Sequence, residues 1–202
     1  MNYIELSLKE LRKISLAEAT KIKEEYPVDL IIYVARAGLP IAMYMNEVFA
    51  VELLGIGAHR KGNALKSKLG PVVRYCPRFV RDLLITIELK TKVHKRNIER
   101  NIEFHNSIET LDTEKYQQIL IVDDSVDTGN SMKLVYRAVR EKFVNADIRT
   151  YSLNVWDDSK QVFMTDYCSY ENTVIRAPMS KDSKEYKEFI AMYEELSNKE
   201  YQ

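Results

Sequence analysis

Three aspartates lie beside a small-residue turn in the segment ILIVDDSVDTGNS, residues 119–131. Asp123 and Asp124 follow a short apolar run, and Asp127 comes three positions after Asp124. Carboxylates bind pairs of hydroxyl groups through charge-assisted hydrogen bonds, or they bind a cation. We therefore expect Asp123 and Asp124 to hold neighbouring hydroxyl groups together with Mg²⁺. Asp127 faces the same space and is a candidate general base.

The turn that follows the acids has the composition of an anion-binding site. We expect a helix to begin near Thr128 and Gly129, and the free N–H groups of a helix N-terminus attract anions. Gly129 permits close backbone approach, and the hydroxyl groups of Thr128 and Ser131 add donors. No GxxxxGK[ST] motif is present, so this is a phosphate cradle of another kind. Two acids alone are more typical of a helix N-cap, but the whole pattern favours a sugar-phosphate site.

Alternating strands and helices must position these residues. Apolar runs predict strands at 29–35, 51–58, 116–125 and 147–156. Helical periodicity predicts helices at 7–26 (one or two), 41–50, 77–104, 129–143 and 184–197, and the rest of the C-terminal part is expected to be irregular. Ser7 and Glu10 have the spacing of a capping box. The alternation predicts an α/β fold with a central, mainly parallel sheet flanked by helices, in which ligands bind at the carboxyl ends of strands. The turn ARAGLP, residues 35–40, falls at the same edge.

The charge of the chain is balanced overall but uneven locally. Lys+Arg and Asp+Glu total 30 each, which gives no indication of a nucleic-acid or membrane partner. Residues 60–100 hold 12 Lys/Arg against 3 Asp/Glu, which indicates either a solvated helix face or a lid that attracts phosphates. Cys76 and Cys168 are far apart and form no metal or redox motif. With no membrane-length apolar stretch and no signal-peptide core, we expect a cytoplasmic protein.

The segment ILIVDDSVDTGNS resembles the binding motif for phosphoribosyl pyrophosphate (PRPP) in type I phosphoribosyltransferases at every diagnostic position. The resemblance implies that Asp123 and Asp124 hold the ribose hydroxyls. It implies that the 5′-phosphate is bound by the turn comprising Asp127, Thr128, Gly129, Asn130 and Ser131. In the purine-salvage branch, the acid that matches Asp127 exchanges a proton with the base.

The turn ARAGLP resembles the pyrophosphate loop of the same family. Ala35, Arg36, Ala37 and Gly38 would offer backbone N–H groups to the pyrophosphate, and Ala37 stands where the family usually has a glycine. The segment TDYCSYENTVIRAPMS, residues 165–180, resembles the purine-binding hood, in which Val174 and Ile175 would pack on the base. Further candidates are Lys160 or Asn154 for the lysine that reads the base, Ser180 or Asp182 for a late metal-binding acid, and Trp156 as a stacking platform.

The resemblance implies one domain over residues 1–202 with the type I phosphoribosyltransferase fold. Its core would span about 25–155, a long helical insertion or lid about 60–110, and a C-terminal hood about 153–182. The basic residues of the insertion could reach the pyrophosphate of a partner subunit; they are Lys90, Lys92, Lys95, Arg96 and Arg100. We expect a Mg²⁺-dependent homodimer that transfers ribose 5-phosphate from PRPP to a nitrogenous base, in the first place a purine, and releases pyrophosphate.

Two other functions remain open at this point. A non-catalytic, PRPP-sensing regulator that binds nucleic acid would keep the same acids and turn, and the basic segment at 60–100 favours it. A phospho-acceptor site of the receiver type would need acids at the ends of other strands and a late lysine, and we cannot place that set in the sequence.

Overall fold

The sheet confirms the predicted α/β fold. The computed structural model describes residues 2–60, 100–104 and 111–199. The strands of the main sheet are β2 (Leu30–Ala35), β3 (Glu52–Arg60), β4 (Arg100–Phe104), β5 (Gln118–Val126), β6 (Asp147–Val155) and β7 (Tyr167–Glu171). They form a six-stranded sheet in the order β4-β3-β2-β5-β6-β7. The pairs β2–β3, β2–β5, β5–β6 and β6–β7 are parallel, so the sheet is mainly parallel as expected.

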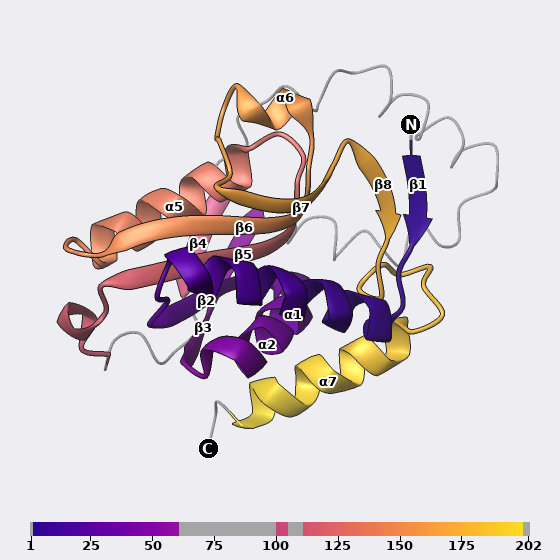
Figure 1. Ribbon diagram of the computed structural model, residues 1–202, viewed down its shortest axis with the longest axis horizontal. Helices are drawn as coiled ribbons and strands as arrows, with labels where there is room; N and C mark the ends of the chain where they lie inside the picture. The colour runs from indigo at the N-terminus through magenta and orange to yellow at the C-terminus, as the bar shows by residue number, and fades with distance from the viewer. Residues whose placement is uncertain (1, 61–99, 105–110, 200–202) are drawn as a thin grey trace, which may run out of the picture. The chain divides into compact units, whose positions relative to one another are not determined.

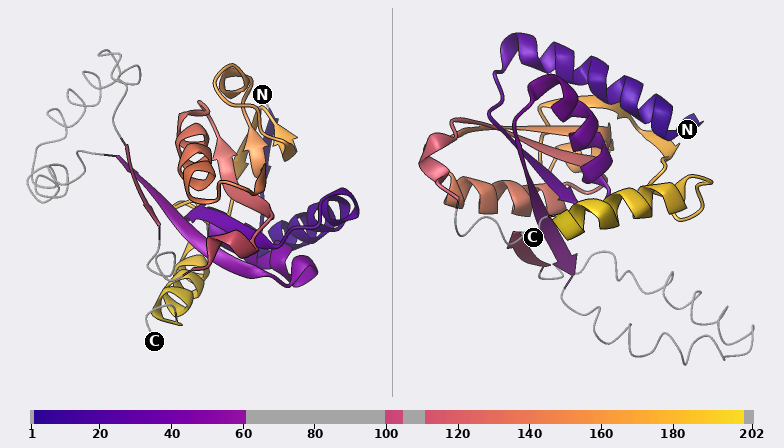
Figure 2. Two further views of the ribbon diagram at one scale, coloured as in Figure 1. Left: turned by 90° about the vertical axis from the view of Figure 1, so that its left-hand side faces the viewer. Right: turned by 90° about the horizontal axis from the view of Figure 1, so that it is seen from below.

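Helices cover both faces of this sheet (Figures 1 and 2). The longer helices are α1 (Leu8–Glu25), α2 (Gly38–Phe49), α5 (Asn130–Lys142) and α7 (Tyr186–Lys199). Alternate residues of β2 belong to two different core clusters, as strand geometry requires. Ile31 and Tyr33 pack with residues of α1, α2 and α7, whereas Leu30 and Ile32 pack with residues of α5. A strand buried on both faces must be apolar throughout, which explains the continuous apolar runs of β2 and β5.

The start of α1 confirms the predicted capping box. The Ser7 hydroxyl accepts a hydrogen bond from the Glu10 N–H at 3.2 Å, and the Glu10 carboxylate accepts one from the Ser7 N–H at 2.8 Å. The helix is continuous through Glu25. Leu11 and Ile22 are among its buried residues, so the apolar periodicity belongs to one amphipathic helix rather than two.

The C-terminal part of the chain contains more regular structure than the sequence predicted. The expected helix is confirmed as α7, but β7 and β8 (Thr173–Arg176) lie in a stretch expected to be irregular. β8 pairs in parallel with β1 (Asn2–Glu5), which is at the other end of the chain (Figure 1). A pairing between such distant segments leaves no local periodic signal. Two short elements complete the described structure, η3 (Thr113–Lys115) and α6 (Asp157–Lys160).

The prediction of a helix over residues 77–104 is wrong at its C-terminal end. Residues 100–104 form strand β4, and the rest of the predicted helix lies outside the described residues. A lack of Gly and Pro permits a strand as well as a helix, and the open edge of the sheet beside β3 decides between them. The predicted lid residues Lys90, Lys92, Lys95 and Arg96 also lie outside the described residues. The chain divides into two units, residues 59–101 and the remainder.

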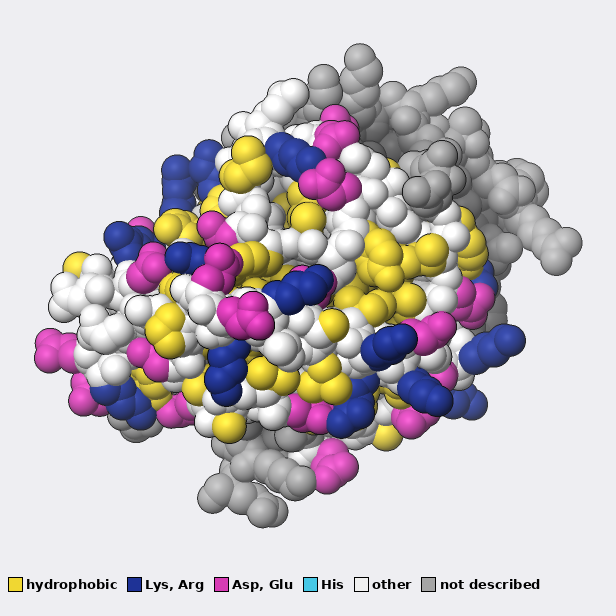
Figure 3. Space-filling model, viewed as in Figure 1, with side chains coloured by type: hydrophobic (Ala, Val, Ile, Leu, Met, Phe, Trp, Pro, Cys, Tyr) yellow, Lys and Arg dark blue, Asp and Glu magenta, His cyan; other side chains and the backbone are white. Residues whose placement is uncertain are grey.

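One face of the molecule agrees with the balanced composition. On the face shown in Figure 3, Lys and Arg side chains are intermingled with Asp and Glu side chains. Within the described ranges, no helix is long and apolar enough to cross a membrane.

Candidate active site

The strand order brings the two turns identified in the sequence to one place. The chain continues from β2 to β3 on one side of the sheet and from β5 to β6 on the other, so the direction of winding reverses between β2 and β5. Residues of β2 and β5 pair from Leu30 and Ile119 as far as Tyr33 and Val122. In open α/β sheets, ligands bind outside the carboxyl ends of the strands at such a switch point.

Gly38 holds the first turn close to β5. It is the first residue of α2, and a Cβ built on it would lie 2.6 Å from the carbonyl oxygen of Val122 and 3.5 Å from Cα of Asp123. Any larger side chain would collide with the backbone of β5. The predicted pyrophosphate loop is therefore packed directly beside the first of the predicted ribose-binding acids.

The turn itself consists of Ala35, Arg36 and Ala37 at the end of β2. The peptide bond between Ala35 and Arg36 is cis, and Leu39 N–H donates to the Arg36 carbonyl at 3.2 Å. The Arg36 side chain is exposed, and its guanidinium carbon lies 5.2 Å from the centroid of the Tyr193 ring. No signal in the sequence pointed to Tyr193, because it belongs to α7, far along the chain.

The second turn has the geometry of an uncapped helix N-terminus. Gly129 is the N-cap of α5 with φ 74°, and no side chain caps the helix there. The N–H groups of the first helical turn have no acceptor within the helix, and the helix dipole adds partial positive charge. The amide of Asn130 donates to the Thr128 hydroxyl at 3.3 Å. The prediction that a helix begins beside Gly129 is confirmed.

The residues packed against Gly129 leave no room for a side chain at this position. A Cβ built on it would lie 2.9 Å from the carbonyl oxygen of Ser159 and 3.1 Å from the backbone nitrogen of Phe163. Ser159 belongs to α6, so this short helix supports the turn from behind. Nothing in the sequence indicated that α6 supports this turn, since its contact with Gly129 is visible only in the folded chain.

Asp123 and Asp124 lie near the end of β5, which continues to Val126 and is followed by the predicted phosphate-binding turn. Asp123 is only 7% exposed, and its carboxylate accepts a hydrogen bond from the Asp124 N–H at 2.9 Å. Burial, and next the negative charge of Asp124, raise the pKa of Asp123 well above its usual range. Burial also raises the pKa of Asp124. The pair therefore holds a proton more readily than two exposed carboxylates would.

Asp127 differs from the other two acids. Its side chain is exposed, and the Ser125 hydroxyl donates to its Oδ1 atom at 2.5 Å. This hydrogen bond orients the carboxylate and leaves its second oxygen available. Asp127 directly follows the end of β5 at Val126 and is the first residue of the predicted phosphate-binding turn.

Comparison with solved structures agrees with the fold. The chain is similar to a purine phosphoribosyltransferase from Pyrococcus horikoshii Ot3, with 19% identity, a TM-score of 0.61, and coverage of 91% of this chain and 97% of that one. It is also similar to the Helicobacter pylori xanthine-guanine-hypoxanthine phosphoribosyltransferase, with 18% identity, a TM-score of 0.63, and coverage of 93% and 99%. The chain has the type I phosphoribosyltransferase fold.

The same fold is found in a Neisseria gonorrhoeae protein solved with bound ppGpp, which has 12% identity, a TM-score of 0.57, and coverage of 96% of this chain and 97% of that one. The sequence matches no protein-family model and no curated protein. The likeness to solved structures therefore concerns the fold.

Within the phosphoribosyltransferase fold, the predicted base-contacting residues lie on β8, outside the main sheet. Val174 pairs with Tyr3 and is 36% exposed, whereas Ile175 pairs with Ile4 and packs partly against the core. Their role in binding a base stays a prediction. Trp156 is half-buried, and its backbone N–H donates to the Val126 carbonyl at 3.1 Å, which places the residue after the end of β6 beside the end of β5.

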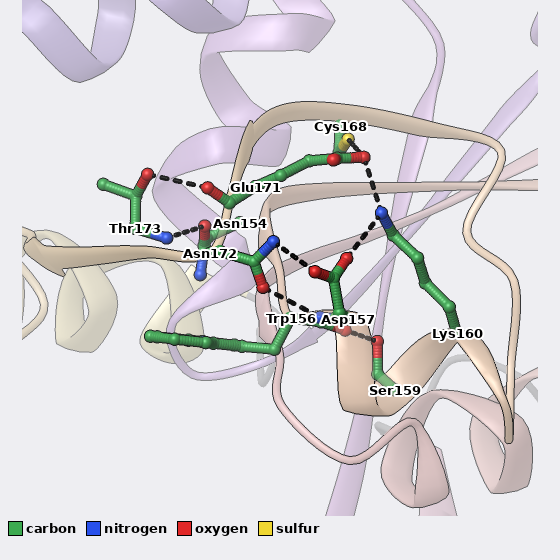
Figure 4. A network of polar contacts seen from close by, with 9 residues as sticks. All are labelled: Asn154, Trp156, Asp157, Ser159, Lys160, Cys168, Glu171, Asn172 and Thr173. Atoms are coloured by element: carbon green, nitrogen blue, oxygen red, sulfur yellow. Dashed lines mark hydrogen bonds and ion pairs between the residues drawn. The ribbon is translucent and has the colours of Figure 1, made fainter. Parts of the chain in front are cut away.

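The two candidates for a base-reading residue are both engaged in internal contacts (Figure 4). Lys160 lies 2.9 Å from the carboxylates of Asp157 and Glu171, and these partners raise its pKa, Asp157 more than Glu171. Asn154 is 2% exposed and accepts a hydrogen bond from Thr173 N–H at 3.3 Å. Lys160 therefore joins α6 to the end of β7, whereas Asn154 joins β6 to the start of β8.

Asn172 completes this network. Its amide donates to the Asp157 carboxylate at 2.7 Å and its carbonyl oxygen accepts from Asp157 N–H at 3.0 Å, while its own backbone has φ 49°. The late metal-binding candidate Asp182 lies 3.0 Å from Nε of Arg176. Ser180, the other candidate, donates its N–H to the Ala177 carbonyl at 2.9 Å.

Asp123 and Asp124 could hold a divalent cation together with a ligand. Among the residues that the structure describes, no group of three or more His, Cys, Asp or Glu side chains could hold a metal ion. Mg²⁺ is usually bound by one or two carboxylates together with substrate phosphates and water. Two adjacent carboxylates therefore suit a cation that arrives with a phosphorylated ligand.

Proposed function

We propose that this protein is a phosphoribosyltransferase that uses PRPP and Mg²⁺ to transfer ribose 5-phosphate to a nitrogenous base, with release of pyrophosphate. The proposal rests mainly on one observation. Two turns suited to anions flank Asp123 at a topological switch point, and Gly38 packs against the backbone beside that acid. A ligand with a phosphate at one end, a diphosphate at the other and hydroxyls between them matches this arrangement.

Each part of the ligand has its own group of residues. Asp123 and Asp124 take the ribose hydroxyls, and because burial raises their pKa values, the pair can both donate and accept hydrogen bonds. The residues from Asp127 to Ser131 take the 5′-phosphate through the N-terminus of α5. Ala35 to Gly38 take the pyrophosphate, with the Arg36 guanidinium as the nearby positive charge.

Catalysis would come mainly from orientation and electrostatics. Breaking the bond between ribose and pyrophosphate leaves positive charge on the sugar ring and negative charge on the leaving group. The fixed N–H groups of the Ala35–Gly38 turn stabilise the negative charge on the pyrophosphate. When bound with the ligand, Mg²⁺ supplies further stabilisation of the leaving group. Asp127, held by the Ser125 hydroxyl, exchanges a proton with the base.

A purine is the first acceptor to test. The two solved phosphoribosyltransferases described above are named for purine substrates, and Val174 with Ile175 remain the predicted apolar contacts for a base. Lys160 and Asn154 are occupied by internal contacts, so the panel should also include bases that lack an oxo group.

The direct experiment is to incubate the protein with PRPP, Mg²⁺ and single bases and to measure pyrophosphate release. The double variant Asp123→Asn/Asp124→Asn should lose the activity, since a pair of amides cannot carry charge or bind Mg²⁺ in the same way. Undiminished turnover by that variant would refute the site assignment. A circular dichroism melt of the same variant shows whether its fold is intact.

A regulator that binds a phosphorylated nucleotide without turnover is the second candidate. The Neisseria gonorrhoeae protein with bound ppGpp has the same fold. In this chain, the two candidates for reading a base, Lys160 and Asn154, contact other residues of the protein instead. Calorimetric titration with PRPP and with ppGpp, combined with the turnover assay, separates the two functions. A gel shift with nucleic acid, with and without PRPP, tests the regulatory alternative that the basic segment at 60–100 suggests.

A homodimer and a cytoplasmic location belong to the same proposal. The homodimer is expected from the resemblance to phosphoribosyltransferases, and the cytoplasmic location from the sequence, which shows no membrane-length apolar stretch and no signal-peptide core. Light scattering coupled to gel filtration tests the first: a mass near 47 kDa, twice the 23.6 kDa of the chain, is expected for a dimer.

A further inference from the structure

We propose that Tyr193 is a positioning residue that holds the Arg36 guanidinium ready for the pyrophosphate group of the ligand. The inference rests on the proposed function, because it takes Arg36 to face that group. Its basis in the structure is a contact between α7 and the turn after β2, in which the guanidinium carbon of Arg36 lies 5.2 Å from the centroid of the Tyr193 ring.

The contact leaves the hydrogen-bonding capacity of Arg36 available. A guanidinium within about 6 Å of a ring centroid is attracted by the charge distribution of the ring. This attraction uses none of the five N–H donors of the guanidinium as hydrogen bonds. Arg36 can thus remain on Tyr193 while its planar fork binds phosphate oxygens in pairs.

Tyr193 itself is held by the packing of α7. Phe189, one turn earlier, is 3% exposed and belongs to the core cluster under α1 and α2. The rings of Tyr186, Phe189 and Tyr193 form a row with centroid separations of 6.0 Å and 6.4 Å. Just before α7, the Glu185 carboxylate accepts a hydrogen bond from Leu8 N–H at 2.5 Å, which ties the start of α7 to the start of α1.

An anchored ring beside an exposed arginine lowers the entropic cost of binding. Without the ring, the long side chain of Arg36 would sample many rotamers and would have to be ordered when the ligand binds. Immobilising such a side chain corresponds to a factor of about three to ten in affinity. The Tyr193 ring therefore makes the C-terminal part of α7 a support of the pyrophosphate subsite, although α7 carries none of its backbone donors.

The experiment uses calorimetric titration of the full-length protein with three probes, namely PRPP with Mg²⁺, pyrophosphate with Mg²⁺, and ribose 5-phosphate. Tyr193→Leu should weaken the binding of PRPP and pyrophosphate about threefold to tenfold. Ribose 5-phosphate lacks the diphosphate group, so its affinity should not change. Tyr193→Phe keeps a ring face and should restore binding to within about twofold of the wild type.

Two controls separate positioning from stability. Tyr186→Leu removes a ring from the other end of the same row; it should lower the melting temperature without changing the affinity for pyrophosphate. In an Arg36→Gln background, Tyr193→Leu should have no further effect, since the residue that it positions has been removed.

The outcomes distinguish this inference from the proposed function. If wild-type protein binds PRPP and pyrophosphate but Tyr193→Leu binds them equally well or more tightly, the role of Tyr193 is refuted and the proposed function stands. An equal loss of ribose 5-phosphate binding, or no rescue by Tyr193→Phe, also refutes it. If the wild type binds none of the three probes, the proposed function fails and the inference fails with it.

Discussion

Gly38 lies directly against the carbonyl group of Val122, and a Cβ on Gly38 would be 2.6 Å from that oxygen. The contact joins the first turn of α2 to the last residue of β5 before the paired acids. It holds the predicted pyrophosphate loop beside the predicted ribose site. A single missing methyl group thus permits the close approach of two segments that lie more than eighty residues apart in the sequence.

Gly38→Ala should damage both stability and ligand binding. The added methyl group meets backbone rather than a flexible side chain, so α2 must move away from β5. We expect a loss of about 1–3 kcal/mol in the free energy of unfolding, measured by urea denaturation, and at least about tenfold weaker PRPP binding. Ala37→Gly is the adjacent control and should cost no more than about 1 kcal/mol. A Gly38→Ala protein with wild-type stability would contradict the close contact.

Asp123→Asn should stabilise the unliganded protein at neutral pH while abolishing PRPP binding. Burial raises the pKa of Asp123 in the folded state above its unfolded value of about 4, so the folded protein binds more protons than the unfolded chain. Stability therefore falls as pH rises from the unfolded pKa through the folded pKa, and the penalty is complete above the latter. Replacing the carboxylate should add about 0.5–2 kcal/mol near pH 7.5.

The pH dependence supplies the check on this prediction. Below about pH 3.5 the carboxyl is protonated in both states, so wild type and Asp123→Asn should have nearly equal unfolding free energies. Asp127→Asn is the matched control because that side chain is exposed; it should change stability by no more than about 0.5 kcal/mol. A gain for Asp123→Asn that is the same at every pH would show that burial of the charge is not its cause.

Asn172 should affect the predicted phosphate turn through α6, to which it is joined by two hydrogen bonds with Asp157. Asn172→Ala removes two hydrogen bonds to Asp157 and forces alanine into a left-handed conformation, so we expect a loss of about 1–3 kcal/mol. Because α6 packs against Gly129, the KM for PRPP should also rise severalfold. Asn172→Gly also removes the hydrogen bonds but adopts the left-handed backbone without strain. Comparison with Asn172→Ala therefore separates the loss of hydrogen bonds from the backbone strain. Lys160→Met, which removes ion pairs to two exposed carboxylates, should cost less than about 1 kcal/mol.

Tyr26→Phe should lower stability without affecting turnover. The buried hydroxyl lies 3.1 Å from the carbonyl oxygen of Ile119 and 2.9 Å from that of Asp147, at the amino ends of β5 and β6. Its removal leaves buried carbonyls with one partner fewer, which costs about 1–2 kcal/mol. Thermal denaturation tests the predicted loss of stability, and the pyrophosphate assay tests the predicted unchanged turnover. Tyr3→Phe, at a side chain that is 56% exposed, should leave both unchanged.

Much of the fold and the outline of the site could be predicted from the sequence. The apolar runs of β2 and β5, the capping box at Ser7 and the small residues around Gly129 all act through neighbours in the chain. Such signals depend on backbone dihedral preferences, hydrophobic periodicity and local hydrogen bonds, which a sequence displays directly. The rule that ligands bind at the carboxyl ends of parallel strands then placed the two turns together.

The tertiary structure alone decided which distant groups meet. It paired β8 with β1, made a strand of residues 100–104, and occupied Lys160 with Asp157 and Glu171. It also brought Tyr193 to Arg36 and α6 to Gly129. These contacts join segments that have no common local pattern, and each forms only because packing of the whole core brings the segments within reach. The sequence by itself therefore predicted the two turns and the paired acids of the proposed PRPP site, whereas packing decided which side chains are engaged elsewhere in the fold.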